Sequence, residues 1–278
     1  MPKILNLKNK DKYTGKLKDV GKMEIKNQTE EKAELYFYGD IVSSTWQSYW
    51  YEEDKCPQDI TDFLKELDNS KAIDIFINSG GGSVHGGLAI YNILKRHQGE
   101  KTVYIDGIAA SIASVIAMAG DKVVIPSNAQ FMIHKPLTWC GGNADDFRKT
   151  ADILDTCQKS IMSIYMDNVQ DGISEEKITE MINEETWLTG DEAAEYFKFE
   201  VEEKSDVVAC TSEYFEKYSK TPKNILKVKE NIKNNIDHDD IVKKVLKELE
   251  NKKALDKKGI DENLEKEKEE ILNDLDLL

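Results

Sequence analysis

Residues 72–94 read AIDIFINSGGGSVHGGLAIYNIL, and the order of patterns within them indicates the fold class. Its first six residues are largely apolar and rich in β-branched side chains, which is typical of a strand buried on both faces. The strand ends at Asn78, a triple glycine follows, and helical spacing then continues through Leu88, Tyr91 and Leu94. A buried strand, a short turn and an amphipathic helix in this order predict an α/β domain.

The same alternation of strands and helices continues on both sides of this unit. Short β-prone runs predict further strands, and longer amphipathic patterns predict further helices. Elements joined in this order by short turns are typical of a sheet with mostly parallel strands. The predicted strands include residues 34–38, 103–105, 123–125 and 131–133, and the predicted helices include residues 61–67, 144–170, 175–182 and 191–197.

The chain divides into three parts by composition. Residues 1–33 are rich in Lys, Asn and Glu with little periodicity, so we expect an extended or partly ordered arm. Residues 34–204 hold the strand and helix patterns and are expected to form the compact domain. Residues 205–278 are dominated by Lys, Glu, Asp and Asn, with sparse apolar positions at helical spacing. They predict a charged, helix-prone tail that needs a partner or stays mobile.

The overall composition argues against several classes of function. The 278 residues include 38 Lys and Arg against 53 Asp and Glu, and the net charge of −15 argues against a nucleic-acid partner, which requires a basic face. The scattered cysteines indicate neither a zinc site nor a disulfide framework. The longest apolar run, residues 107–120, is shorter than the roughly 20 residues of a membrane-spanning helix, and the first residues lack a secretory signal. We expect a cytoplasmic protein without membrane contact, metal or organic cofactor.

One serine and one histidine form a candidate catalytic pair. Ser111 lies in GIAASIA at residues 107–113, where small residues allow a tight turn from a strand into a helix whose N-terminus favours negative charge. His134 closes the strand at residues 131–133, at the edge where α/β sheets bind ligands, and imidazole is the usual base for a serine hydroxyl. Taken singly, each also has a structural explanation, as a packing serine and a strand-capping histidine. The remaining histidines lie in polar or exposed surroundings: His85, His97 at a solvated helix end, and His238.

The triple glycine at residues 80–82 predicts a loop whose backbone approaches a ligand closely. The pattern G-x-x-x-x-G-K-[ST] is missing and no Lys follows the glycines, which argues against a nucleotide site. The amides of Gly81 and Ile112 instead suit an oxyanion hole beside the serine.

Four motifs in this order resemble the proteolytic subunit of Clp protease (ClpP), a family of S14 serine peptidases. The resemblance covers about residues 34–204, and the sequence is most similar to the phage and prophage branch of ClpP-related head maturation proteases. The motifs are INSGGGSVHGGLAIYNIL at residues 77–94, DGIAASIASVIAMAG at 106–120, FMIHKP at 131–136 and ETWLTGDEAAEY at 185–196.

The resemblance implies a ClpP/crotonase-like α/β fold of repeated β-β-α units and a catalytic triad. It assigns the nucleophile to Ser111 and the general base to His134. The third member falls on Glu185, where the family more often has Asp, so the bond that orients the imidazole is made from a longer arm. Glu184 and Asp191 are neighbouring alternatives for the acid.

The resemblance also implies the rest of the site and the assembly. The oxyanion amides fall on Gly81 and Ile112, and Gly80 replaces a proline that is usual in the family, which leaves the loop less rigid. The helix at residues 144–170 corresponds to a protruding handle through which two heptameric rings stack. A substrate is expected to lie extended beside the glycine loop and residues 136–142. Backbone hydrogen bonds would hold it there whatever its side chains are.

The leading interpretation is a serine endopeptidase that cleaves polypeptides through an acyl-enzyme intermediate. The resemblance and the long charged tail favour phage prohead maturation, in which capsid or scaffold protein is trimmed in the host cytoplasm. The alternative is a general Clp proteolytic subunit that receives unfolded chains from an ATP-dependent AAA+ unfoldase. Two more distant alternatives are a crotonase-like acyl-CoA enzyme, which typically uses carboxylates rather than a Ser–His pair, and a scaffold without activity.

Overall fold

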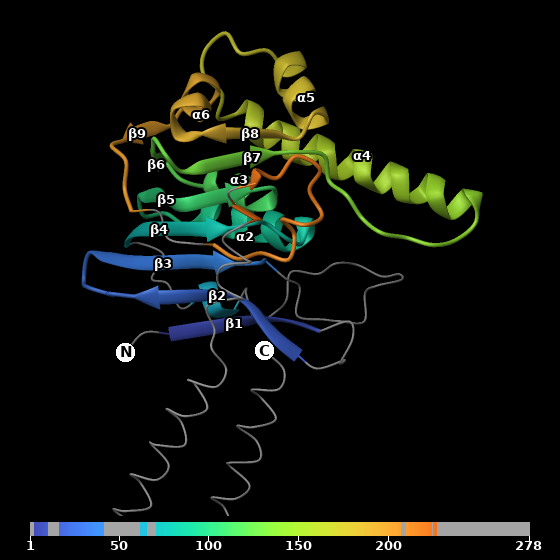
Figure 1. Cartoon of the computed structure of the whole chain (residues 1–278). Helices are drawn as coiled ribbons and strands as arrows, with labels where there is room; N and C mark the ends of the chain where they lie inside the picture. Colours follow the sequence, from blue (N-terminus) through green and yellow to red (C-terminus); the bar gives the residue numbers. More distant parts are fainter. Residues whose placement is uncertain are drawn as a thin grey trace, which may run out of the picture. The chain divides into compact units, whose positions relative to one another are not determined.

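The computed structural model describes residues 3–10, 17–41, 62–65, 71–206, 210–223, 225 and 226. Within these residues a nine-stranded mixed sheet forms the centre, and helices pack against it (Figure 1). Five of these strands lie side by side and each pairs in parallel with its neighbour among the five, which confirms the predicted α/β class. These strands are β3 (Lys32–Gly39), β4 (Ala72–Ser79), β5 (Lys101–Ala110), β6 (Lys122–Pro126) and β9 (Glu200–Glu202).

The sheet branches along β5, and this branch positions the candidate site. The first half of β5 pairs with β6, and its second half pairs in parallel with β7 (Gln130–Ile133). Strand β8 (Thr186–Thr189) then pairs antiparallel with β7. The C-terminal ends of β5 and β7 and the N-terminal end of β8 therefore meet at one edge.

Two helices follow the loops at this edge. α2 (Val84–Arg96) begins after the triple glycine, and its N-cap Ser83 accepts a hydrogen bond from the Gly86 amide. α3 (Ile112–Ala117) begins directly after β5, and its residues are all buried. Gly87 lets the two helices approach closely, because a Cβ there would lie 2.1 Å from Cγ1 of Ile112.

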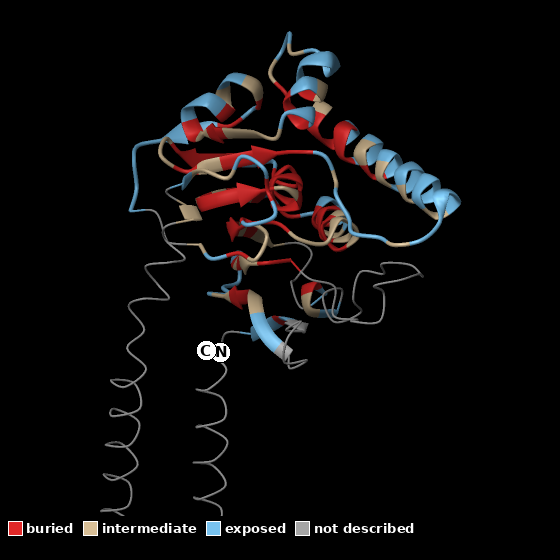
Figure 2. Cartoon of the chain, turned by 45° about the vertical axis from the view of Figure 1, so that its right-hand side comes forward, coloured by how far each residue is buried: buried red, intermediate tan, exposed pale blue. Residues whose placement is uncertain are grey.

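The later helices are α4 (Ala144–Met166), α5 (Glu175–Asn183) and α6 (Gly190–Tyr196). α4 begins at Asn143, whose side chain forms a capping box with Asp146. Its buried residues start at Cys157, whereas the N-terminal half extends away from the sheet with exposed side chains (Figures 1 and 2). Within the described part of the chain, no helix has the length and apolar character needed to cross a membrane.

Strand β4 is buried on one face, whereas the sequence predicts burial on both. Ile73, Ile75 and Ile77 are at most 1% exposed. On the other face, Phe76 is half-buried and stacks between Tyr36 and Tyr104, with ring centroids 4.6 and 5.2 Å away. These aromatic rings cover one another across three strands, which accommodates an apolar residue on this face.

The N-terminal residues differ from the arm expected for residues 1–33. They form two antiparallel strands of the main sheet, β1 (Lys3–Lys10) and β2 (Leu17–Lys26), and β2 pairs with β3. The alternation is concealed by charged neighbours, because Met23 and Ile25 face the core at 0% and 1% exposure while Lys22, Glu24 and Lys26 occupy the alternate positions.

The C-terminal boundary also differs from the one expected at residue 204. Residues 210–226 pack back onto the domain, and the compact unit extends to Leu226. Phe215 and Tyr218 supply the reason, because their side chains are 1% and 7% exposed in a cluster with Ile108 and Met132. The remainder of the predicted tail lies outside the described residues.

Candidate active site

The strand register brings the three predicted catalytic positions to one edge of the sheet. Ala110 pairs with Met132, so Ser111 and His134 each follow the paired ends of β5 and β7. Ile133 pairs with Thr186 in the antiparallel β7–β8 ladder. Extending that register by one residue sets Glu185 opposite His134.

Ser111 occupies a strained turn between β5 and α3. Its φ of 56° and ψ of −126° lie in a region that non-glycine residues rarely adopt, and its amide donates to the Met132 carbonyl at 2.9 Å. Such strain persists only where the surrounding structure holds it, and it is frequent at active sites. The turn presents the hydroxyl at the N-terminus of α3, as the sequence predicts.

Ser111 and His134 are in direct contact. The Ser111 Oγ lies 2.7 Å from Nε2 of His134, within hydrogen-bond distance. Burial lowers the pKa of His134 to about 4, and the negative charge of Glu185 opposes only part of this shift. The imidazole is therefore neutral at pH 7, and Nε2 can accept the serine proton.

Glu185 lies near this pair, but its carboxylate is bound elsewhere. It accepts hydrogen bonds from the amides of Ser219 at 2.7 Å and Lys220 at 2.6 Å, and from the Trp187 indole at 3.2 Å. Among the hydrogen bonds of the described residues, none joins Glu185 to His134. Its φ of 52° makes it a second strained residue at the same edge.

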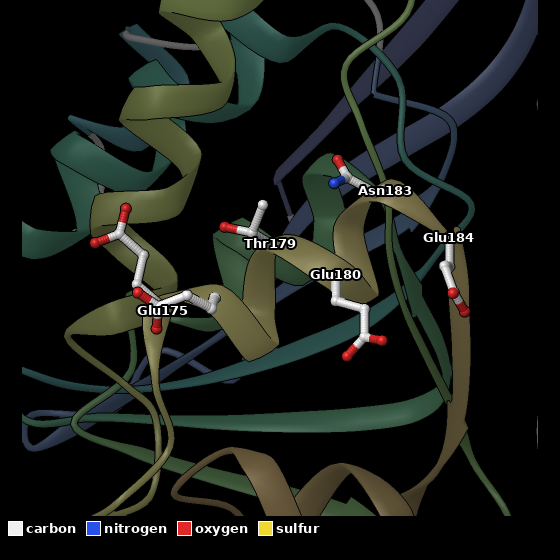
Figure 3. A pocket seen from close by; sticks show the side chains of 6 residues that line it. Glu175, Thr179, Glu180, Asn183 and Glu184 are labelled. Atoms are coloured by element: carbon white, nitrogen blue, oxygen red, sulfur yellow. The ribbon is translucent and has the colours of Figure 1, made fainter.

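The alternative acids lie in other surroundings. Glu184 caps the C-terminal end of α5 and lines a hollow of about 560 Å³ along that helix, together with Glu175, Thr179 and Glu180 (Figure 3). This acidic hollow includes neither Ser111 nor His134 in its lining. Asp191 is exposed in the first turn of α6.

The two predicted oxyanion donors flank the serine. Gly81 has a φ of +99°, and a Cβ there would lie 2.7 Å from Cβ of Ser111, so only glycine fits without strain. Its amide donates to Oγ of Ser79 at 3.1 Å. Ile112 is the first residue of α3, where amides have no partner inside the helix.

The other histidines are structural where the structure describes them. His97 is 8% exposed rather than solvated, and its Nε2 lies 2.6 Å from the Lys71 carbonyl. That contact ties the end of α2 to the residue before β4. His85 lies 4.0 Å from Sγ of the buried Cys157, and His238 lies outside the described residues.

Comparison with known proteins identifies the family. A family model described as Clp protease matches residues 53–197, which is more than half of the chain. The chain belongs to the Clp protease family. Three relatives share its sequence over nearly half of this chain, and all are ATP-dependent Clp protease proteolytic subunits by name.

The Bacteroides fragilis subunit is 35% identical over 137 residues, which cover 48% of this chain and 65% of that protein. Subunit 3 of Streptomyces coelicolor is 34% identical over 136 residues, covering 48% and 61%. The Streptococcus agalactiae subunit is 32% identical over 139 residues, covering 48% and 69%. The chain thus spans just under two thirds of the first two relatives.

One segment beside Ser111 and His134 was not predicted from the sequence. Tyr218 donates to the Gly80 carbonyl at 2.6 Å, and its ring meets that of His134 edge to face at 4.9 Å. The aromatic residues Phe215 and Tyr218, three positions apart within the charged tail, were the available signal for a packed segment.

Proposed function

We propose that this chain is a serine endopeptidase that hydrolyses polypeptides through Ser111, His134 and Glu185. The observation that carries this proposal is the 2.7 Å contact between Oγ of Ser111 and Nε2 of a neutral His134, made at a strained strand-to-helix turn. Membership of the Clp protease family, a family of serine peptidases, supports the same chemistry.

In the proposed reaction, Oγ of Ser111 attacks the peptide carbonyl and its proton passes to Nε2 of His134. The oxyanion that forms lies toward the N-terminus of α3, where the Ile112 amide donates. Gly81 is the second proposed donor, and its amide must release Oγ of Ser79 to take this role. The protonated imidazole then gives its proton to the departing amine, which leaves an acyl-enzyme. A water molecule hydrolyses the ester by the same two proton transfers.

Glu185 is proposed as the acid that orients His134 and stabilises the imidazolium. The β7–β8 register supports this role, because it sets the two residues opposite each other. Glu185 also acts on the pKa of His134 through its charge. Its carboxylate now accepts from the Ser219 and Lys220 amides, so it must shift in order to accept a hydrogen bond from Nδ1.

The proposed enzyme works as a homo-oligomeric ring. Apolar side chains on the projecting part of α4 support a subunit contact there, because Phe147 and Ile153 are 51% and 57% exposed. The helix therefore has the character of the handle through which rings stack. Sedimentation of the full chain tests this assembly and would give the number of subunits.

Two cellular settings follow from this activity. The names of the relatives support a proteolytic subunit that works with an ATP-dependent unfoldase. The motif resemblance and the long charged C-terminal region support the trimming of capsid or scaffold protein in a phage prohead. Incubation with unfolded model proteins, with and without an unfoldase, and with capsid proteins separates the two settings.

The function is tested by covalent labelling of the serine. We expect a fluorophosphonate to modify the full chain at Ser111, as located by peptide mass spectrometry, and Ser111→Ala to abolish both labelling and peptide cleavage. Sedimentation checks that the variant assembles as the wild type does. Equal labelling of the two proteins refutes this nucleophile.

A further inference from the structure

Residues 210–221, here called the cover segment, lie against the proposed catalytic groups. Tyr218 makes the central contact, since its phenol donates to the Gly80 carbonyl at 2.6 Å and its ring meets that of His134 edge to face at 4.9 Å. A Cβ added at Gly81 would lie 3.1 Å from this hydroxyl and 2.7 Å from Cβ of Ser111. The phenol therefore lies between the glycine loop and the nucleophile.

The cover segment also occupies the backbone groups that a substrate strand needs. The Gly80 carbonyl accepts from Tyr218. The Cys210 thiol donates to the Asn78 carbonyl at 3.5 Å. An extended peptide that adds to this loop by main-chain hydrogen bonds requires the same groups.

Buried anchors hold the segment in place. The Glu213 amide donates to Oδ2 of Asp40 at 3.1 Å, and Asp40 is 2% exposed. Phe215 is 1% exposed and packs beside Trp187, with ring centroids 6.4 Å apart. The segment is thus docked by apolar burial and by hydrogen bonds at both ends.

The two departures from the family's usual residues both face this segment. Gly80 replaces the usual proline, and a Cβ at this position would lie 2.4 Å from Cβ of Ser212. Glu185 replaces the usual Asp, and its carboxylate receives the Ser219 and Lys220 amides. Gly80 leaves space for the cover segment, and the longer side chain of Glu185 reaches the backbone amides of that segment.

We propose that the cover segment is an intramolecular ligand of the active site, which blocks Ser111 until a polypeptide substrate or a cut in the chain displaces it. This inference rests on the proposed function and adds its regulation. The class of ligand that competes with the cover is an extended polypeptide, because the contested groups are the backbone atoms of Gly80 and the space beside Ser111.

The inference is tested by the rate at which a fluorophosphonate labels Ser111 in the full chain. Tyr218→Ala removes the phenol and leaves every proposed triad residue unsubstituted. We expect labelling at least about tenfold faster, because the labelling rate follows the fraction of molecules in which the cover segment is displaced. Lys217→Ala is the matched control, since Lys217 belongs to the same segment and its side chain is exposed. We expect the control to label within about twofold of the wild type.

Ser212→Leu supplies a second, independent displacement, because a larger side chain cannot fit against Gly80. Faster labelling of both this variant and Tyr218→Ala, with an unchanged control, supports the cover. Labelling of the wild type as fast as both variants, or slower labelling of both, overturns the inference and leaves the peptidase intact. Absence of Ser111-dependent labelling from every protein overturns the proposed function and the inference with it.

Discussion

Gly80→Ala tests the cover segment from the opposite side, through the loop on which it rests. The new Cβ would lie 2.3 Å from Oγ and 2.4 Å from Cβ of Ser212, and 3.0 Å from Cε1 of Phe215. Contacts this short force a shift, and overpacking of this kind costs about 1–3 kcal/mol. If the cover segment shifts and the glycine loop does not, the equilibrium constant for docking of the segment falls by about 5- to 150-fold.

The assay combines labelling kinetics with a double-mutant cycle. We expect Gly80→Ala to accelerate fluorophosphonate labelling of Ser111 by about the factor lost in docking, within the 5- to 150-fold range. Ser212→Gly removes both of the closest atoms, so the double variant should recover most of the lost docking free energy. The single Ser212→Gly variant is the reference, because it also loses the hydrogen bond from the Tyr214 amide.

Two results refute this reasoning. The first is a Gly80→Ala protein that labels at the wild-type rate with additive effects in the double variant, because additivity shows that the two positions do not interact. The second is slower labelling of Gly80→Ala, which shows that the loop and not the cover absorbs the new side chain.

Two further predictions concern ionisable groups. Burial raises the pKa of Asp40 to about 6, against 3.8 for the ordinary group, so its proton is bound more tightly in the folded chain and wild-type stability falls as pH rises from about 4 to 6. Asp40→Asn removes this loss, and urea unfolding should favour the variant by about 2.4 kcal/mol more at pH 7.5 than at pH 4; a pH-independent difference contradicts this assignment. Glu185→Gln, placed in the open Tyr218→Ala protein, should lower kcat for a peptide substrate by roughly 10³- to 10⁴-fold. A nearly unchanged kcat moves the acid role to Glu184 or Asp191.

The parts of the fold that could be predicted from sequence are those with local patterns. The β4–α2 unit and the strand before His134 have apolar spacing that differs clearly from their surroundings, and the turn at Ser111 has small residues on both sides. The hairpin of β1 and β2 escaped prediction because charged neighbours conceal its alternation, although Met23 and Ile25 face the core.

The cover segment could not be predicted, because its contacts join residues far apart in the chain. Tyr218 lies 138 positions from Gly80, and Glu213 lies 173 positions from Asp40. Composition places this stretch in a polar tail, since two buried aromatic residues hardly change the average. Its docking depends on space at Gly80 and on the reach of Glu185, and both become visible only once the strands are in register.

In the proposed mechanism, opening of the cover and completion of the triad both depend on the carboxylate of Glu185. One oxygen of Glu185 receives the Lys220 amide and the Trp187 indole, and the other receives the Ser219 amide. These donors hold the carboxylate in a position where it makes no hydrogen bond to His134, so a bond to Nδ1 requires it to shift. A substrate strand that displaces the cover from Gly80 therefore frees the acid in the same event. Because binding and activation are coupled in this way, a substrate that fails to displace the cover meets a serine whose base is not yet oriented.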